Sequence, residues 1–302
     1  MTHSKQLVVI VTGSDSGFGL LTARALAKAG HIVYGGLFRS DDGSYPNYQE
    51  FTEESKQNGY RLHGVHLDVT KDDIVDTAIK QVLSDHGRVD AIVHNAGHMA
   101  LGPAESFSPE QFMKMYDTNC VGCHRLNQAV LPTMRKQKSG LLVWVTSGSV
   151  HGPSSPFLAP YFAAKAAQDS LAQTTALEVS QWGIETSIVV PGIFTSGTNH
   201  FATAMKPDNT RIEKEYADGP TKGWLEKCLN GSANMGREDV PPQAVGDAIV
   251  DIFNAQPGSR PWRVHVEPEG PMAVRTNEVR DKVREEYLTR MGCADLIHVR
   301  IR

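Results

Sequence analysis

Short apolar runs alternate with longer amphipathic stretches along most of this 302-residue chain. Most of the runs end in glycine, proline or a small polar residue. They cover residues 7–13, 31–37, 61–69, 89–97, 140–147, 184–192 and 261–268. Because Val, Ile and Leu follow one another without alternating polar residues, these runs are typical of strands that are buried on both faces of a parallel sheet.

The stretches between the runs have helical periodicity. They cover Phe18–Ala29, Tyr48–Asn58, Lys71–His86, Phe112–Gln137, Tyr161–Trp182 and Pro242–Ala255. A repeated strand–helix–strand order predicts a Rossmann-type, doubly wound α/β fold, with seven mostly parallel strands and helices on both faces of the sheet. No internal repeat or low-complexity linker interrupts this order, so we expect a single domain over residues 1–302.

Two segments depart from the alternation. Residues 194–239 are polar with scattered aromatic side chains, and so long a connection is usually a binding segment. We expect a substrate-binding lid there, with disorder as the alternative. Residues 272–302 are charged and partly helical, which predicts a C-terminal helical tail packed on the same domain.

Charge and hydropathy weigh against several classes of partner. A net charge of -4 and an isoelectric point near 6.3 give no reason to expect a nucleic-acid partner. The first apolar run, Leu7–Val11, is shorter than the roughly 7–15 apolar residues of a secretory signal. No run approaches the roughly 20 residues of a membrane span. We therefore expect a cytoplasmic protein whose four cysteines stay reduced.

A glycine-rich turn, TGSDSGFG, follows the first run and covers residues 12–19. Gly13, Gly17 and Gly19 would let the backbone turn tightly, approach a pyrophosphate and pack the next helix closely. The N-terminus of that helix would offer N–H groups to the phosphates. The spacing differs from Gly-x-Gly-x-x-Gly, so a plain strand-to-helix turn is the alternative.

Cys120, Cys123 and His124 form the Cys-x-x-Cys-His pattern of c-type haem attachment. Covalent haem attachment belongs to exported proteins, and this chain shows no export signal. A zinc site would need a second Cys/His pair at matching spacing, which the sequence lacks. We expect the two cysteines to be small packing residues, and we expect neither haem nor a metal.

Four further motifs follow the glycine-rich turn in register with the predicted strands. Asp68 ends the third run in HLDVT, residues 94–97 read HNAG, Tyr161 and Lys165 stand four apart in YFAAK, and residues 191–195 read PGIFT. In this order the five motifs resemble the short-chain dehydrogenase/reductase superfamily, in its single-domain, hydroxysteroid and retinol dehydrogenase-like form. The resemblance covers roughly residues 5–270 and implies that the domain both binds a dinucleotide and carries the catalytic site.

Tyr161 and Lys165 lie on one helix face, one turn apart. Hydride transfer to a ketone needs a proton donor for the developing alkoxide, and the reverse reaction needs a base. A free phenol, with a pKa near 10, is a poor base, and a neighbouring ammonium lowers that pKa. The resemblance implies that Tyr161 is the acid/base and that Lys165 also holds the nicotinamide ribose.

The resemblance also implies a catalytic serine and a catalytic asparagine. Counting from Gly140 along the strand places the serine at Ser147, whereas counting back from Tyr161 lands on Gly148, so Ser149 stays an alternative. The asparagine of an Asp-x-Asn-x-x-Gly pattern is Asn119. It is expected to anchor a water that links Lys165 to solvent.

The resemblance carries a set of cofactor-binding residues onto this chain. They are Gly13, Ser14, Ser16, Gly17, Phe18, Gly19, Arg39, Asp68, Val69, Asn95, Ala96, Gly97, Tyr161, Lys165, Pro191, Gly192 and Thr195. Leu37 stands where a carboxylate would accept hydrogen bonds from the ribose 2′-OH of NAD, and Arg39 is near enough for a 2′-phosphate. The sequence therefore predicts that NADP(H) is preferred over NAD(H).

These features predict an NADP(H)-dependent oxidoreductase that interconverts a ketone or aldehyde and the corresponding alcohol. Phe194, Phe201, Tyr216 and Trp224 suggest a small apolar or aromatic substrate, and His98 is a candidate to border it. A homodimer or homotetramer is expected. The alternatives are a non-redox lyase or epimerase of the same fold and a non-catalytic NADP-sensing protein, although a sensor has no reason to keep all four catalytic residues.

Overall fold

The computed structural model describes residues 6–38, 48–150, 154–195, 197–237 and 239–301. Within them a single sheet has the strand order β3-β2-β1-β4-β5-β6-β7, and every neighbouring pair is parallel. The strands are β1 Val8–Val11, β2 Ile32–Leu37, β3 Arg61–His66, β4 Ala91–His94, β5 Gly140–Val145, β6 Ile184–Pro191 and β7 Arg263–Val266. The predicted seven-stranded Rossmann-type sheet is confirmed, and these strands are all parallel.

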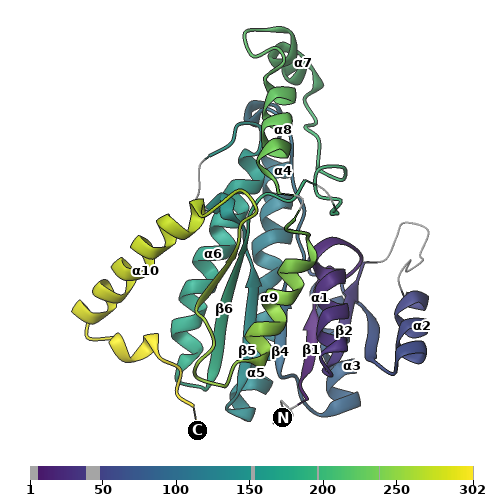
Figure 1. Cartoon of the computed structure of the whole chain (residues 1–302), viewed down its shortest axis with the longest axis vertical. Helices are drawn as coiled ribbons and strands as arrows, with labels where there is room; N and C mark the ends of the chain where they lie inside the picture. Colours follow the sequence, from purple (N-terminus) through teal and green to yellow (C-terminus); the bar gives the residue numbers. More distant parts are fainter. Residues whose placement is uncertain (1–5, 39–47, 151–153, 196, 238, 302) are drawn as a thin grey trace.

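Helices cover both faces of the sheet (Figure 1). Alternate residues of each central strand enter opposite cores: Val8 and Ile10 of β1 pack on one side, and Val9 and Val11 on the other. Since both sides are buried, neither needs polar residues, which explains the continuous apolar runs.

The ten α-helices of the described residues follow the predicted order with additions. They are α1 Gly17–Lys28, α2 Tyr48–Asn58, α3 Asp72–His86, α4 Pro109–Tyr116, α5 Gly122–Gln137, α6 Ala159–Ser180, α7 Thr210–Asp218, α8 Trp224–Met235, α9 Gln243–Asn254 and α10 Met272–Arg290. Helices α3, α5 and α6 cover one face of the sheet, and α1, α2 and α9 the other. No helix in these ranges is long and apolar enough to cross a membrane.

The single helix expected over residues 112–137 is wrong in one respect. Helix α4 begins earlier, at Pro109, where the Ser108 side chain and Gln111 form a capping box. A π-helical turn, Asp117–Val121, then separates α4 from α5. Such turns often occur at functional sites because the extra residue redirects a side chain.

Residues 194–239 contain two helices, α7 and α8, in place of the expected loop. Both stand beyond the carboxyl ends of the strands, where α/β folds bind ligands (Figure 1). Helix α10 follows β7 and slopes away from α6 toward the outside of the molecule (Figure 1).

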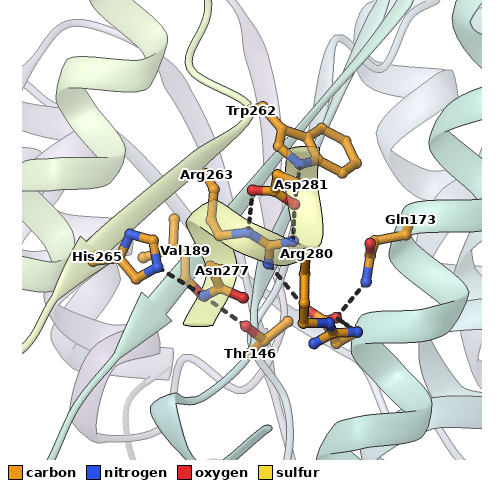
Figure 2. Close-up of polar contacts among 10 residues, drawn as sticks. Thr146, Gln173, Val189, Trp262, Arg263, His265, Asn277, Arg280 and Asp281 are labelled. Carbon is orange, nitrogen blue, oxygen red and sulfur yellow. Dashed lines mark hydrogen bonds and ion pairs between the residues drawn. The ribbon is translucent and has the colours of Figure 1, made fainter. Parts of the chain in front are cut away.

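A buried ionic network ties α6, β7 and α10 together. The Arg263 guanidinium on β7 contacts Asp169 of α6 at 3.1 Å and Asp281 of α10 at 2.9 Å (Figure 2). Trp262 also donates to Asp281, at 3.2 Å. Because Asp169 lies one turn after Lys165, the network fixes the helix that carries the candidate catalytic pair.

Candidate active site

The glycine-rich turn adopts backbone conformations that favour glycine. Gly13 has φ +64° and Gly17 has φ +54°. A Cβ at Gly13 would lie 2.9 Å from Ala96 Cα, and one at Gly19 would lie 2.0 Å from the Gly13 carbonyl oxygen. The turn therefore packs against its surroundings more closely than any larger residue permits.

The turn opens onto a small cavity of about 90 Å³. Its lining includes Gly13, Ser16, Gly17, Phe18, Asn95, Ala96, Gly97, His98 and His200. The Ser16 side chain makes no capping hydrogen bond at the N-terminus of α1. The N–H groups of that first turn are thus available to an anion, so the residues present fit the pyrophosphate of a dinucleotide.

Asn95 braces the turn from β4. Its Nδ2 donates to the carbonyls of Thr12 and Gly13 at 2.9 and 3.1 Å. The Thr12 hydroxyl in turn accepts from the backbone N–H groups of Asn95 and Ala96. Thr12 was not among the expected site residues, although its position directly before Gly13 is the signal that marks it.

Several expected cofactor residues line neither this small cavity nor the larger cavity described below. The Ser14 hydroxyl is buried and donates to the Val11 carbonyl. Asp68 accepts from Thr70 after β3, Val69 is buried beside it, and Thr195 is exposed. Ser14 therefore stabilises the turn from within and does not face the cavity.

The end of β2 lacks a carboxylate of its own. Leu37 is fully buried, and the next residue, Phe38, donates its backbone N–H to the Asp15 carboxylate at 3.0 Å. Burial raises the pKa of Asp15 above its ordinary value, against the hydrogen bond from Phe38. Arg39 lies outside the described residues.

The four expected catalytic residues line one larger cavity of about 520 Å³. Asn119 comes from the π-helical turn, Ser147 follows β5, and Tyr161 and Lys165 belong to α6. Pro191 and Gly192, at the end of β6, form another part of the wall. The parallel sheet brings these segments together because their strands end at the same edge.

Lys165 is buried among fixed acceptors. Its Nζ donates to the Val145 carbonyl and to Gln168 Oε1, each at 2.9 Å. Burial lowers the pKa of Lys165 to about 8. Gln168 is also fully buried, and sequence patterns gave no signal for it.

Tyr161 has a pKa above its ordinary value. Burial raises it, and a hydrogen bond with the Ser147 side chain lowers it to a smaller extent. This direction is opposite to the lowering that a neighbouring ammonium alone would produce. The phenol is therefore protonated at neutral pH.

Ser147 and Ser149 differ in their surroundings. The Ser147 hydroxyl faces Tyr161 and also accepts from the backbone N–H of Ser149 at 3.1 Å. The Ser149 hydroxyl is buried without a hydrogen-bond partner among the described residues. The geometry thus pairs Ser147, not Ser149, with Tyr161.

Asn119 is fully buried and only half satisfied. Its Nδ2 donates to the Met115 carbonyl at 3.0 Å and to the His98 carbonyl at 3.2 Å. Its Oδ1 has no partner among the described residues, and a Cβ at Gly97 would lie 2.4 Å from that oxygen. A buried acceptor of this kind indicates a place for a water or a ligand.

The two cysteines of the haem-like pattern are buried, as expected for packing residues. The Cys123 thiol donates to the Asn119 carbonyl at 3.7 Å and accepts from Gln168 Nε2 at 3.4 Å. Burial raises the pKa of Cys123 to about 12. Across the described ranges, no group of three or more His, Cys, Asp or Glu side chains is arranged to hold a metal.

Much of the remaining wall of the larger cavity is apolar. Of the aromatic residues that the sequence singled out, Phe194 and Phe201 line it. Tyr216 and Trp224 do not: Tyr216 donates to Glu105, and Trp224 is about half exposed. The wall also includes Met99, Leu158, Phe162, Met235, Met272, Glu267 and Glu269.

The fold and the two adjoining cavities together define a Rossmann-type oxidoreductase. More narrowly, the chain belongs to the short-chain dehydrogenase/reductase family, whose model, described as short chain dehydrogenase, matches residues 7–207. The resemblance found in the motifs is thereby confirmed, and members of this family are NAD(P)-dependent dehydrogenases and reductases.

Three similar proteins illustrate the family. A 3-ketodihydrosphingosine reductase of Bacteroides thetaiotaomicron is 29% identical over 265 residues, which cover 86% of this chain and 88% of the relative. A cyclopentanol dehydrogenase of Comamonas sp. is 32% identical over 248 residues, covering 82% and 89%. The crystal structure of a short-chain dehydrogenase from Streptomyces avermitilis has a TM-score of 0.70 at 28% identity, and the match covers 95% of this chain and 96% of that one.

Proposed function

We propose that this protein is an NADP(H)-dependent carbonyl reductase that interconverts a ketone or aldehyde and the corresponding alcohol. One observation carries the proposal: Asn119, Ser147, Tyr161 and Lys165, from three separate segments, line a single cavity next to the glycine-rich turn. The names of the two relatives, a reductase of a keto compound and a dehydrogenase of an alcohol, support this chemistry.

The residues around the glycine-rich turn and Lys165 would bind the cofactor. The turn from Gly13 to Gly19 would hold the cofactor's pyrophosphate, and Lys165 its nicotinamide ribose. A bound NADPH would supply the hydride to the carbonyl carbon. The buried Leu37 offers no acceptor for a ribose 2′-OH, which favours NADP(H).

Tyr161 is the proposed proton donor. Its hydroxyl is protonated at neutral pH and gives its proton to the substrate oxygen, while the Ser147 hydroxyl donates a hydrogen bond to the same oxygen. Lys165 stabilises the phenolate and returns a proton to it. The unpartnered Oδ1 of Asn119 would hold the water that resupplies Lys165.

The segment 194–239 is proposed to cover the substrate. Phe201 precedes α7, Cys228 and Met235 belong to α8, and all three line the larger cavity. We also propose one domain over residues 1–302, with a helical tail from 272, and assembly as a homodimer or homotetramer. Light scattering after gel filtration tests the last point.

Loss of NADPH absorbance against a panel of ketones and aldehydes tests the proposed function. Tyr161→Phe should lower turnover by about 10²–10⁴-fold while keeping NADPH affinity, because the phenol acts on the substrate. Tyr216→Phe is the matched control, since that hydroxyl contacts only Glu105 among the hydrogen bonds described.

Other outcomes would contradict the proposal. A lyase or epimerase would transform its substrate without net consumption of NADPH. A sensor would bind NADPH and turn over none of the panel. Near-parent rates in Tyr161→Phe would remove Tyr161 from the mechanism.

A further inference from the structure

Two carboxylates line the larger cavity together with its apolar side chains. Glu267 and Glu269 follow β7 and line the same space as Tyr161 and Lys165. His200 also lines it, but burial lowers the pKa of that imidazole to about 4, so it is neutral. Neither carboxylate has a part in the proton transfer described above.

Glu269 lies against the segment that directly follows β6. Its Oε2 accepts from the backbone N–H of Ile193 at 2.9 Å. The carboxylate packs directly on Gly192, where an added Cβ would lie 2.1 Å from Oε2. Its Oε1 would lie 3.8 Å from a Cβ at Gly148, the residue that follows Ser147. The carboxylate is therefore held against the backbone of Gly192 and Gly148, in the wall of the cavity that Ser147 and Tyr161 also line.

Glu267 has a different task. Its two oxygens accept from the backbone N–H groups of Ala273 and Val274, at 2.6 and 3.2 Å. These are N–H groups in the first turn of α10, so Glu267 satisfies a helix N-terminus. It is a natural control for Glu269, because it lines the same cavity with both oxygens engaged elsewhere.

Burial is unfavourable for the charge on Glu269 and raises the pKa of that carboxyl. The hydrogen bond from the Ile193 N–H lowers this pKa to a smaller extent, and repulsion from Glu267 raises it further. A cation in the cavity would relieve both effects, because a charge-assisted contact between ammonium and carboxylate is strong where water is excluded.

We propose that Glu269 is a specificity-determining residue that binds an ammonium group next to the substrate carbonyl, so that the preferred substrates are amino ketones with a long apolar chain. This inference rests on the proposed function and names its substrate class. The apolar wall of Met99, Phe201 and Met235 would take the chain. A substrate with a carboxylate in place of the ammonium would be repelled.

The test compares three matched ketones: a long-chain ketone with a neighbouring primary amine, its uncharged analogue and an analogue with a carboxylate. In the parent, kcat/KM with NADPH should favour the amino ketone over the uncharged one by at least about tenfold, and the carboxylate should be the poorest. In Glu269→Gln the side-chain oxygen still accepts from Ile193 but the charge is gone. The amine-to-neutral ratio should then fall to about one.

The control Glu267→Gln should keep the parent ratio, because its oxygens serve α10. An unchanged ratio in Glu269→Gln, or a parent that prefers the uncharged ketone, would overturn the inference. The same holds if Glu267→Gln loses the ratio as completely as Glu269→Gln does.

A binding measurement separates this inference from the proposed function. Dodecylamine and dodecanol carry no carbonyl, and calorimetry gives their affinities without turnover. Dodecylamine should bind the parent more tightly than dodecanol, and Glu269→Gln should remove the difference. If no ketone is reduced but this difference is found, the proposed function fails and the ammonium site stands. Equal affinities in the parent would overturn the site.

Discussion

The ammonium of Lys165 donates a hydrogen bond to Oε1 of Gln168, three residues further along α6 and 2.9 Å away. Gln168 is itself held in place, because its Nε2 donates to the buried Cys123 thiol at 3.4 Å. With the Val145 carbonyl as a second acceptor, two of the three ammonium protons are engaged. The third is left for another acceptor, so Gln168 would position the ammonium that we propose acts on Tyr161 and the cofactor.

Replacing Gln168 should shift the pH dependence of reduction. Gln168→Leu removes an acceptor from the ammonium, so the pKa of Lys165 should fall below about 8 and activity should decline at a lower pH. Gln168→Glu places a carboxylate there and should shift the decline to higher pH. The check is kcat/KM measured across pH 6 to 10 for both variants. Coincident profiles for the parent and both variants would remove Gln168 from this role.

Lys165 should destabilise the folded protein at neutral pH. The folded protein gives up this proton at about pH 8, whereas the unfolded chain keeps it until its ordinary value of 10.5. Between those values the unfolded state binds more protons, so stability should rise with pH. Lys165→Met should unfold at a higher urea concentration than the parent at pH 7. Its free energy of unfolding should be greater than that of the parent by at most about 3 kcal/mol. That advantage should shrink toward pH 10.5, and a constant difference would contradict the burial argument.

Breaking the buried network should have a large structural effect. Arg263→Ala leaves the fully buried Asp169 carboxylate without its strongest partner, and loss of one member of such a pair costs about 3–5 kcal/mol. Urea unfolding measures this. The control is Arg211→Ala, whose partner Glu215 is exposed and which should change stability by about 0.5 kcal/mol at most. Equal effects of the two changes would mean that the network adds no stability.

The sheet was predictable from the sequence because its strands are buried on both faces. The apolar runs needed no partner to be recognised, and helix α2 begins and ends at the expected residues, Tyr48–Asn58. The π-helical turn was not predictable, since one extra residue at Asp117–Val121 leaves the apolar period of the flanking helices intact. Nor were α7 and α8, because no residue of either helix is buried in the core and α7 is polar overall.

Some residues of the candidate site were predictable from the sequence and others were not. Tyr161, Lys165 and Asn119 stand in local motifs, and the resemblance of those motifs to the short-chain dehydrogenase/reductase family indicated them. Glu269 accepts a hydrogen bond from the backbone of Ile193, 76 residues away, and such a contact between distant segments leaves no local pattern. Gln168 was hidden for a related reason, because its partner Cys123 lies on another helix, 45 residues away.

Ser147→Ala should lower activity more than Ser149→Ala. Counting along the sequence left both serines open, because the loop before Tyr161 differs by one residue from the usual length. In the structure the Ser147 hydroxyl faces Tyr161, so its loss removes a donor to the substrate oxygen and a contact that lowers the pKa of the phenol.

We expect about 10²–10³-fold lower kcat for Ser147→Ala, the scale of losing one oxyanion donor. Ser149→Ala should cost less than tenfold, because its buried hydroxyl contacts no partner within the described ranges. The pH profile gives a second readout: only Ser147→Ala should move the phenol's titration, and upward. The reverse order of activities would show that the count back from Tyr161, and not the count along β5, gives the register of this loop.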